Sequence, residues 1–100
     1  MKKAYVVAEI QITNPEQYAA YRELSTAAAA QYGGTFLVRG GVREQWEGED
    51  EIHNSGWRTV IIEFASTEQA RAWYNSPEYR KALEIRLANS VGRLFMIEGA

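Results

Sequence analysis

The first apolar segment, Ala4–Ile12, alternates between two sets of side chains, which is the period of a β-strand with two unlike faces. The run TNPE follows, in which Asn14 or Thr13 is placed to cap a helix and Pro15 to occupy its first position. Beyond it, apolar residues recur every three or four positions, which predicts a helix that ends at Gly33. A strand and an amphipathic helix therefore open the chain.

Further segments have the period of strands, and a helical region separates the last two. The expected strands are Thr35–Arg39, Trp57–Phe64 and Val91–Glu98. Paired glycines after Arg39 mark a bulge or a bend, beyond which Val42–Trp46 is expected to continue the strand. Ser66 begins the second helix and Ser76 restarts it, so this region is predicted to be kinked into two pieces. The segment Glu47–Gly56 is acidic and rich in turn-forming residues, which indicates a solvated hairpin loop or a mobile arm.

The predicted order of elements is strand, helix, strand, strand, helix, strand. Two strand–helix–strand units of this kind form the split βαβ arrangement. Right-handed crossovers then place the four strands in one antiparallel sheet, with both helices on one face. A chain of 100 residues is long enough for one such domain, residues 1–100, with a single core. The sequence therefore predicts an α+β fold of the order βαββαβ.

Both faces of the predicted sheet are largely apolar. The residues expected toward the helices are Val6, Ala8, Ile10, Phe36, Val38, Val60, Ile62, Phe64, Leu94 and Met96. The opposite face is expected to hold Tyr5, Val7, Leu37, Ile61, Phe95 and Ile97, mixed with Glu9, Arg39, Thr59 and Glu63. A single copy would expose this second face to water, whereas a second copy packed sheet against sheet would cover it. We therefore expect a homodimer through the sheet face, in which the two sheets close into a barrel.

Arg39 and Glu63 are the candidate catalytic residues. Both are expected on the face turned away from the helices, where they would line a partly buried polar cavity. In one interpretation, Arg39 binds the carboxylate or enolate of a small ligand, and Glu63 or Glu9 is a base or a hydrogen-bond acceptor. In the other, an arginine–carboxylate pair neutralises itself inside the dimer and has only a structural role. The sequence leaves both interpretations open.

Tyr21 and Tyr79 are further candidate ligand-binding residues, because their hydroxyls could donate at a cavity mouth. The alternative is that they fill the core and that each hydroxyl finds a backbone acceptor. His53, the single histidine, would be the natural general base of an enzyme. It lies, however, in the turn-rich run EDEIHNSG, where a metal ion would be poorly fixed. We predict no metal site and no cofactor.

The composition narrows the classes of function. With 46% hydrophobic and 24% charged residues, the chain has the composition of an ordinary globular protein. It contains no cysteine, which excludes disulfides, thiolate metal sites and cysteine nucleophiles. A net charge of −2 and scattered basic residues argue against nucleic acid as a partner. No stretch approaches the ~20 apolar residues of a membrane span, and no signal-peptide pattern follows the N-terminal lysines, so we expect a cytoplasmic protein.

Four segments give the chain a resemblance to a known family. The runs YGGTFLVRGG (Tyr32–Gly41), VIIEF (Val60–Phe64) and WYNSPEY (Trp73–Tyr79) are similar to an uncharacterised bacterial family, the domain of unknown function 1330. The opening TNPEQYAAY (Thr13–Tyr21) resembles it too, so the likeness covers nearly the whole chain. This resemblance implies a ferredoxin-like fold of the dimeric α/β-barrel superfamily, and it implies no reaction. The segment Glu47–Gly56 is longer than we expect for the family.

Two hypotheses of function follow, and the sequence does not decide whether the protein is an enzyme. The first is a small-molecule-binding protein or cofactor-independent enzyme that acts on a small carboxylate or carbonyl compound beside Arg39 and Glu63. Relatives in the superfamily include cofactor-independent monooxygenases, dehydratases and isomerases, which is an analogy of fold. The second is a non-enzymatic dimeric module for binding or regulation, in which the charges of the cavity are structural.

Overall fold

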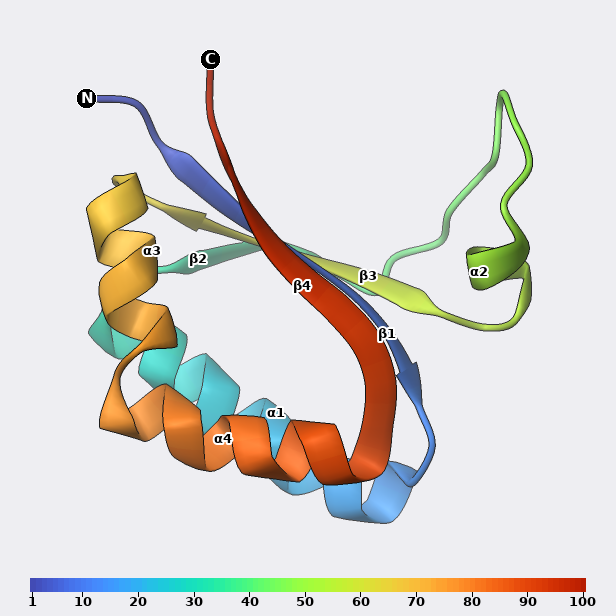
Figure 1. The fold of residues 1–100 in the computed structure, drawn as a ribbon, viewed down its shortest axis with the longest axis horizontal. Coiled ribbons are helices and arrows are strands. Elements are labelled where there is room, and N and C mark those ends of the chain that lie inside the picture. Colours follow the sequence, from blue (N-terminus) through green and yellow to red (C-terminus); the bar gives the residue numbers. More distant parts are fainter.

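A four-stranded antiparallel sheet, covered by helices on one face, forms the protein in a computed structural model that describes residues 1–100 (Figure 1). The strands are β1 (Ala4–Ile12), β2 (Thr35–Arg39), β3 (Arg58–Phe64) and β4 (Ser90–Glu98). They lie in the spatial order β2-β3-β1-β4, and every neighbouring pair is antiparallel. The helices are α1 (Pro15–Gln31), α2 (Glu51–Asn54), α3 (Thr67–Tyr74) and α4 (Pro77–Asn89). The predicted ferredoxin-like fold is confirmed, with α3 and α4 as the two pieces of the kinked helical region.

Side-chain caps fix the beginnings of the helices as predicted. The Asn14 side chain accepts a hydrogen bond from the backbone N–H three residues later, at 3.4 Å. The hydroxyls of Ser66 and Ser76 do the same, each at 3.1 Å. Gly33 ends α1 with a φ of +78°, the left-handed conformation that glycine adopts without a steric cost. The Ser76 hydroxyl also donates to the carbonyl of Trp73 at 2.7 Å, so this one side chain joins α3 to α4.

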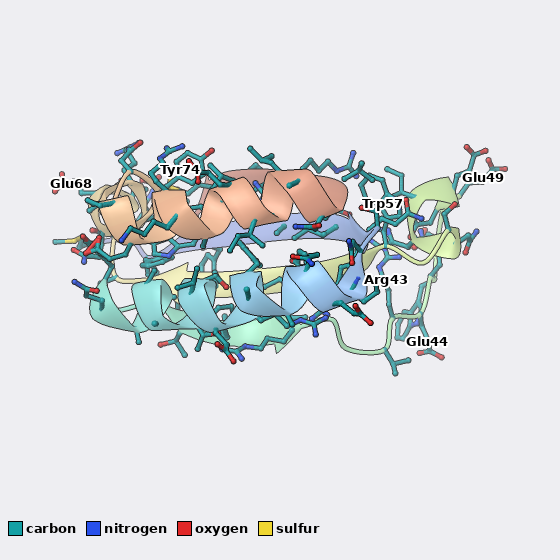
Figure 2. The ribbon with its side chains drawn as sticks, turned by 90° about the horizontal axis from the view of Figure 1, so that it is seen from below. Arg43, Glu44, Glu49, Trp57, Glu68 and Tyr74 are labelled. Atoms are coloured by element: carbon teal, nitrogen blue, oxygen red, sulfur yellow. The ribbon has the colours of Figure 1, made fainter.

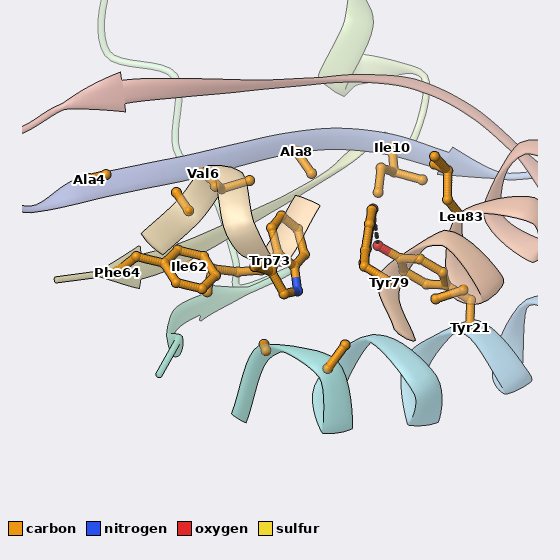
Figure 3. Packing of buried hydrophobic residues seen from close by; sticks show 14 of the residues in the cluster. Ala4, Val6, Ala8, Ile10, Tyr21, Ile62, Phe64, Trp73, Tyr79 and Leu83 are labelled. Carbon is orange, nitrogen blue, oxygen red and sulfur yellow. Dashed lines mark hydrogen bonds between the residues drawn. The ribbon is translucent and has the colours of Figure 1, made fainter. Parts of the chain in front are cut away.

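The core lies between the sheet and the long helices (Figure 3). Alternate residues of β1 point into it, as the period of two requires; they are Ala4, Val6, Ala8 and Ile10. Trp73 of α3 is fully buried at its centre, with ring centroids 4.2 Å from Tyr79 and 5.3 Å from Phe64. These aromatic contacts fasten the kinked helical region to the end of β3.

An irregularity in β2 changes the side on which this strand ends. The pairs between β2 and β3 are Thr35–Glu63, Phe36–Ile62, Val38–Ile61 and Arg39–Val60, with a register shift between Phe36 and Val38. Because side chains alternate along a strand, one extra residue reverses the faces of those that follow it. Arg39 is therefore on the helix-covered face, and Val38 is on the open face. The prediction that Arg39 and Glu63 share a face is wrong, and the predicted placement of Val38 is wrong for the same reason.

The segment between β2 and β3 also differs from its prediction. Gly40 turns the chain out of the sheet with a φ of +66°, and its N–H donates to the Thr59 carbonyl at 2.7 Å. Val42–Trp46, which was expected to continue the strand, forms no strand, because it lies beyond this turn without a partner. The expected solvated loop contains the short helix α2, which Figure 1 shows beyond the beginning of β3, apart from the other helices.

The open face of the sheet carries the expected apolar side chains. Leu37, Phe95 and Ile97 expose 51%, 45% and 55% of their surface, respectively, in the single chain. Polar side chains lie at both ends of this face. None of the helices combines the length and the apolar character that a membrane crossing requires.

Candidate functional site

A cavity of about 70 Å³ lies between the helix-covered face of the sheet and α1. Most of its walls are apolar and aromatic, and no aspartate or glutamate lines it. Its polar side chains are Arg22, Ser25 and Thr26 of α1, Arg39 of β2 and Arg58 of β3, together with the hydroxyls of Tyr18 and Tyr21. The cavity is therefore apolar with a positively charged border.

The bulge in β2 and the glycine after it bring two arginines to this cavity. Arg39 reaches the helix-covered face because of the bulge, and its guanidinium lies 3.7 Å from the centre of the Phe36 ring. Arg58 lies on the same face at the start of β3, opposite Ile10 of β1. A β-carbon at Gly40 would lie 2.8 Å from Nε and Nη2 of Arg58, so only glycine lets this guanidinium lie against the turn.

The arginines around the cavity have no carboxylate partner. They are Arg22, Arg39 and Arg58, and Arg86 of α4 behind them. None of these four takes part in an ion pair of the chain. Arg86 is only 6% exposed, and its Nε, like the Nε of Arg58, is buried without a hydrogen-bond partner. The indole N–H of Trp73, which also lines the cavity, is a third buried donor without an acceptor.

The tyrosines near the cavity carry neutral, protonated hydroxyl groups. The hydroxyls of Tyr21 and Tyr79 lie 3.1 Å apart and share a hydrogen bond (Figure 3). Burial raises the pKa of Tyr21, of Tyr79 and of Tyr18, although the nearby arginines partly oppose the shift at Tyr18. Tyr21 lines the cavity, whereas Tyr79 lies behind it in the core. Tyr21 can thus donate a hydrogen bond to a ligand but is a poor base.

Glu63 lies on the other side of the sheet from Arg39. Its carboxylate accepts a hydrogen bond from the Tyr5 hydroxyl at 3.1 Å and forms an ion pair with Lys3 at 3.4 Å. The hydrogen bond to Glu63 is the main cause that raises the pKa of Tyr5. The predicted polar cavity lined by both Arg39 and Glu63 does not exist in the structure, because the sheet separates the two side chains.

Glu9 is also on the open face, in a cluster with His53 that sequence reasoning missed. Its carboxylate lies 2.9 Å from Nε of Arg93 and 2.9 Å from Nε2 of His53. Nδ1 of His53 lies 2.8 Å from the Asp50 carboxylate, and this hydrogen bond lowers the pKa of Asp50 below its usual range. The cluster ties α2 to the sheet and leaves the His53 side chain only 8% exposed.

A shallow polar hollow of about 350 Å³ adjoins this cluster and includes Arg43, which pairs with Asp50. Figure 2 shows Arg43 and Trp57 together at this end of the molecule. The spacing of Asp50 and His53, three residues apart at the start of a short helix, was the one local signal of the cluster. No group of three or more histidine, cysteine, aspartate or glutamate side chains is arranged to hold a metal ion.

Comparison with known proteins gives a family and a fold. The model of DUF1330, a domain of unknown function, matches residues 3–100. No curated protein matches the chain. Among solved structures, the protein of unknown function RPA0582 from Rhodopseudomonas palustris is 22% identical, with a TM-score of 0.77 over 99% of this chain and 83% of its own.

Two further structures share the fold at lower identity. SnoaB from Streptomyces nogalater, a cofactor-independent oxygenase, is 13% identical, with a TM-score of 0.68 over 100% of this chain and 95% of its own. Rv0793 from Mycobacterium tuberculosis is 13% identical, with a TM-score of 0.61 over 95% of this chain and 92% of its own. At these identities the likeness extends to the fold alone.

Proposed function

The chain belongs to the DUF1330 family, and we propose that it binds a small carboxylate or carbonyl compound in the cavity between the sheet and α1. It acts there as a binding protein or as a cofactor-independent enzyme. The observation that supports this proposal is the set of arginines beside an apolar cavity that holds no carboxylate of its own. Among the arginines that line the cavity, Arg58 is half-buried, whereas Arg22 and Arg39 are exposed. A half-buried cation calls for a negative partner, and an anionic ligand is the partner that the fold leaves room for.

Arg39 is the residue that we assign to the ligand carboxylate. Its guanidinium lies over the ring of Phe36 on an edge strand of the sheet, and a guanidinium can bind a carboxylate through two N–H groups at once. Arg39 itself remains exposed while the walls behind it are apolar, so a ligand enters from solvent past this charge. Electrostatic attraction at the mouth and apolar contact inside are the usual features of small-molecule sites.

An enzymatic role would use the same groups. Arg39, Arg58 and the neutral hydroxyl of Tyr21 are donors that could stabilise negative charge as an enolate or alkoxide forms on a carbonyl substrate. The shared fold with SnoaB, a cofactor-independent oxygenase, supports this version by analogy alone. Glu63 and Glu9 have no part in it, because both lie across the sheet from the cavity.

We also propose that two copies pair through the open face of the sheet. Its exposed apolar side chains, Leu37, Phe95 and Ile97, come from both edge strands, so the apolar surface extends across the sheet. An isologous dimer would cover this surface on both copies at once.

A non-enzymatic dimeric module is the second candidate. The observation that favours it is that the acidic side chains of the open face are already paired within one chain. Glu63 is paired with Lys3, and Glu9 with Arg93 and His53. Such pairs need no ligand and fit a structural role in an interface.

The replacement of Arg39 by alanine distinguishes the two candidates. Thermal unfolding is measured with a panel of small carboxylates and carbonyl compounds, with Arg71→Ala, an exposed arginine of α3, as the control. We expect a binding carboxylate to stabilise the wild type by about 2.7 kcal/mol at one hundred times its Kd. Arg39→Ala should lose this stabilisation with an unchanged melting temperature in buffer, and Arg71→Ala should keep it. A lower melting temperature for Arg39→Ala, with no compound stabilising the wild type, would favour the structural module.

A further inference from the structure

Two buried donors in the cavity wall have no acceptor in the protein. They are Nε of Arg58 and the indole Nε1 of Trp73. Trp73 is completely buried, and Figure 3 shows its nitrogen on the side of the ring that faces α1. Buried polar groups in folded proteins almost always have a partner, so each of these two donors calls for an explanation.

The two donors come from different elements of the cavity wall, β3 and α3. Arg58 is opposite Ile10, near the end of β1. The ring of Trp73, on α3, lies between Phe64 and Tyr79, with ring centroids 5.3 Å and 4.2 Å away. The cavity is lined by β1 from Val6 to Ile10, a length of about 13 Å at the usual rise of a strand. A small ligand in the cavity could therefore offer one acceptor to Arg58 and a second acceptor to Trp73.

The other side chains of the cavity wall offer contact but few acceptors. Alternate residues of β1 and β3, including Ala8, Val60 and Ile62, form an apolar wall. The hydroxyl of Ser25 donates to a backbone carbonyl, and that of Tyr21 shares its bond with Tyr79. With no carboxylate in the wall, the cavity suits a molecule that accepts hydrogen bonds and has no donors of its own.

Resting on the function proposed above, we infer that the ligand is a small compound with two acceptor groups joined by an apolar body, such as a dicarboxylate or an oxo-carboxylate. Arg58 holds a carboxylate at one end, and the N–H of Trp73 donates to an oxygen at the other. A site built from paired donors discriminates strongly against a molecule that lacks one of the acceptors, since a buried donor then stays unpaired. Trp73 would thus determine specificity.

Two pairs of probes test this inference by calorimetry. Crotonate and fumarate differ by the exchange of one methyl for a carboxylate, and the smaller pair propionate and malonate differs in the same way, which suits a cavity of about 70 Å³. For the wild type we expect the dicarboxylate of at least one pair to bind at least tenfold more tightly than its monocarboxylate. Trp73→Phe keeps an aromatic ring without the N–H and should weaken the dicarboxylate more than the monocarboxylate, so that the difference between them is lost. Trp57→Phe, outside the cavity, is the control and should behave as the wild type.

The outcomes separate this inference from the proposed function. If none of the four probes binds, both fall. If monocarboxylates bind as tightly as their dicarboxylate partners, or if the difference in affinity between them persists in Trp73→Phe, the proposed function stands. The inference that the ligand offers a second acceptor to Trp73 is then refuted. Equal weakening of both probes by Trp73→Phe would mean that this side chain only supports the fold. Circular dichroism establishes that Trp73→Phe is folded, and if it is not, the comparison within each pair on the wild type decides alone.

Discussion

Replacing Gly40 by alanine tests the contact that holds Arg58 beside the cavity. The new β-carbon would lie 2.8 Å from Nε and Nη2 of Arg58, which is closer than real contacts of this kind. The residue also has a φ of +66°, a left-handed conformation that costs an alanine roughly 1–2 kcal/mol. The guanidinium must therefore move, and the backbone must bear the strain in addition.

Two other glycines separate these effects. Gly33 has a similar φ of +78°, but a β-carbon there would meet nothing within 4 Å, so Gly33→Ala reports the backbone cost alone. Gly41 has neither a positive φ nor a close neighbour, and Gly41→Ala should be neutral or stabilising by about 0.4–1 kcal/mol. We expect Gly33→Ala to lose roughly 1–2 kcal/mol of unfolding free energy and Gly40→Ala to lose at least as much.

Urea and thermal unfolding at one fixed protein concentration measure these differences, since 1 kcal/mol corresponds to roughly 4–8 °C in a domain of this size. Binding of the carboxylate probes is then measured on each variant. Gly40→Ala should bind more weakly than Gly33→Ala, because only the former displaces Arg58. If Gly40→Ala is as stable as Gly41→Ala, or binds the probes as Gly33→Ala does, the proposed link between this glycine and the cavity is refuted.

Other predictions concern the open face and the titratable groups. Ile61→Asp should replace the dimer by monomer or aggregate in light scattering, since it would bury an unpaired charge; an unchanged dimer would mean that another surface joins the copies. Burial raises the pKa of Tyr21 and Tyr79. Their contribution to the free energy of unfolding is therefore complete below the ordinary tyrosine pKa of about 10 and is lost as the pH rises above it. The double variant with phenylalanine at both positions should therefore lose less stability in alkali, and equal losses would contradict this. The hydrogen bond from His53 lowers the pKa of Asp50, so the Asp50 carboxylate stabilises the fold above pH about 4 and this contribution is lost as the pH falls. His53→Gln should therefore reduce the loss of unfolding free energy on the acid side. An unchanged pH dependence would show that the pair of His53 and Asp50 contributes nothing to stability.

The elements of the fold could be predicted because their signals are local. The alternation in Ala4–Ile12 and the caps at Asn14, Ser66 and Ser76 each depend on a few neighbouring residues, and the structure confirms them. The paired glycines after Arg39 predicted a bulge or a bend, and the chain does bend at Gly40, whereas the bulge of β2 lies before Arg39.

The positions of two site residues could not be predicted, for different physical reasons. The residues of the run TFLVR are compatible with a regular strand and with a bulged one. The register that places Arg39 is therefore set by pairing with β3 and not by the run itself. The covered position of His53 depends on Glu9, a residue far away in the sequence on β1. A contact of this kind leaves no trace in the composition of the segment around His53.

The bulge has a consequence for the relation between assembly and function. With Arg39 on the open face, a ligand would have been enclosed only when a second copy arrived, and binding would have depended on dimerisation. With Arg39 on the helix-covered face, the cavity walls all come from one chain, namely from α1, α3 and the strands of a single sheet. A second copy would cover the open face without supplying any residue to the cavity. The monomeric form of Ile61→Asp, if it stays folded, should therefore bind carboxylates as the wild type does, and a loss of binding together with the dimer would place the site at the interface instead.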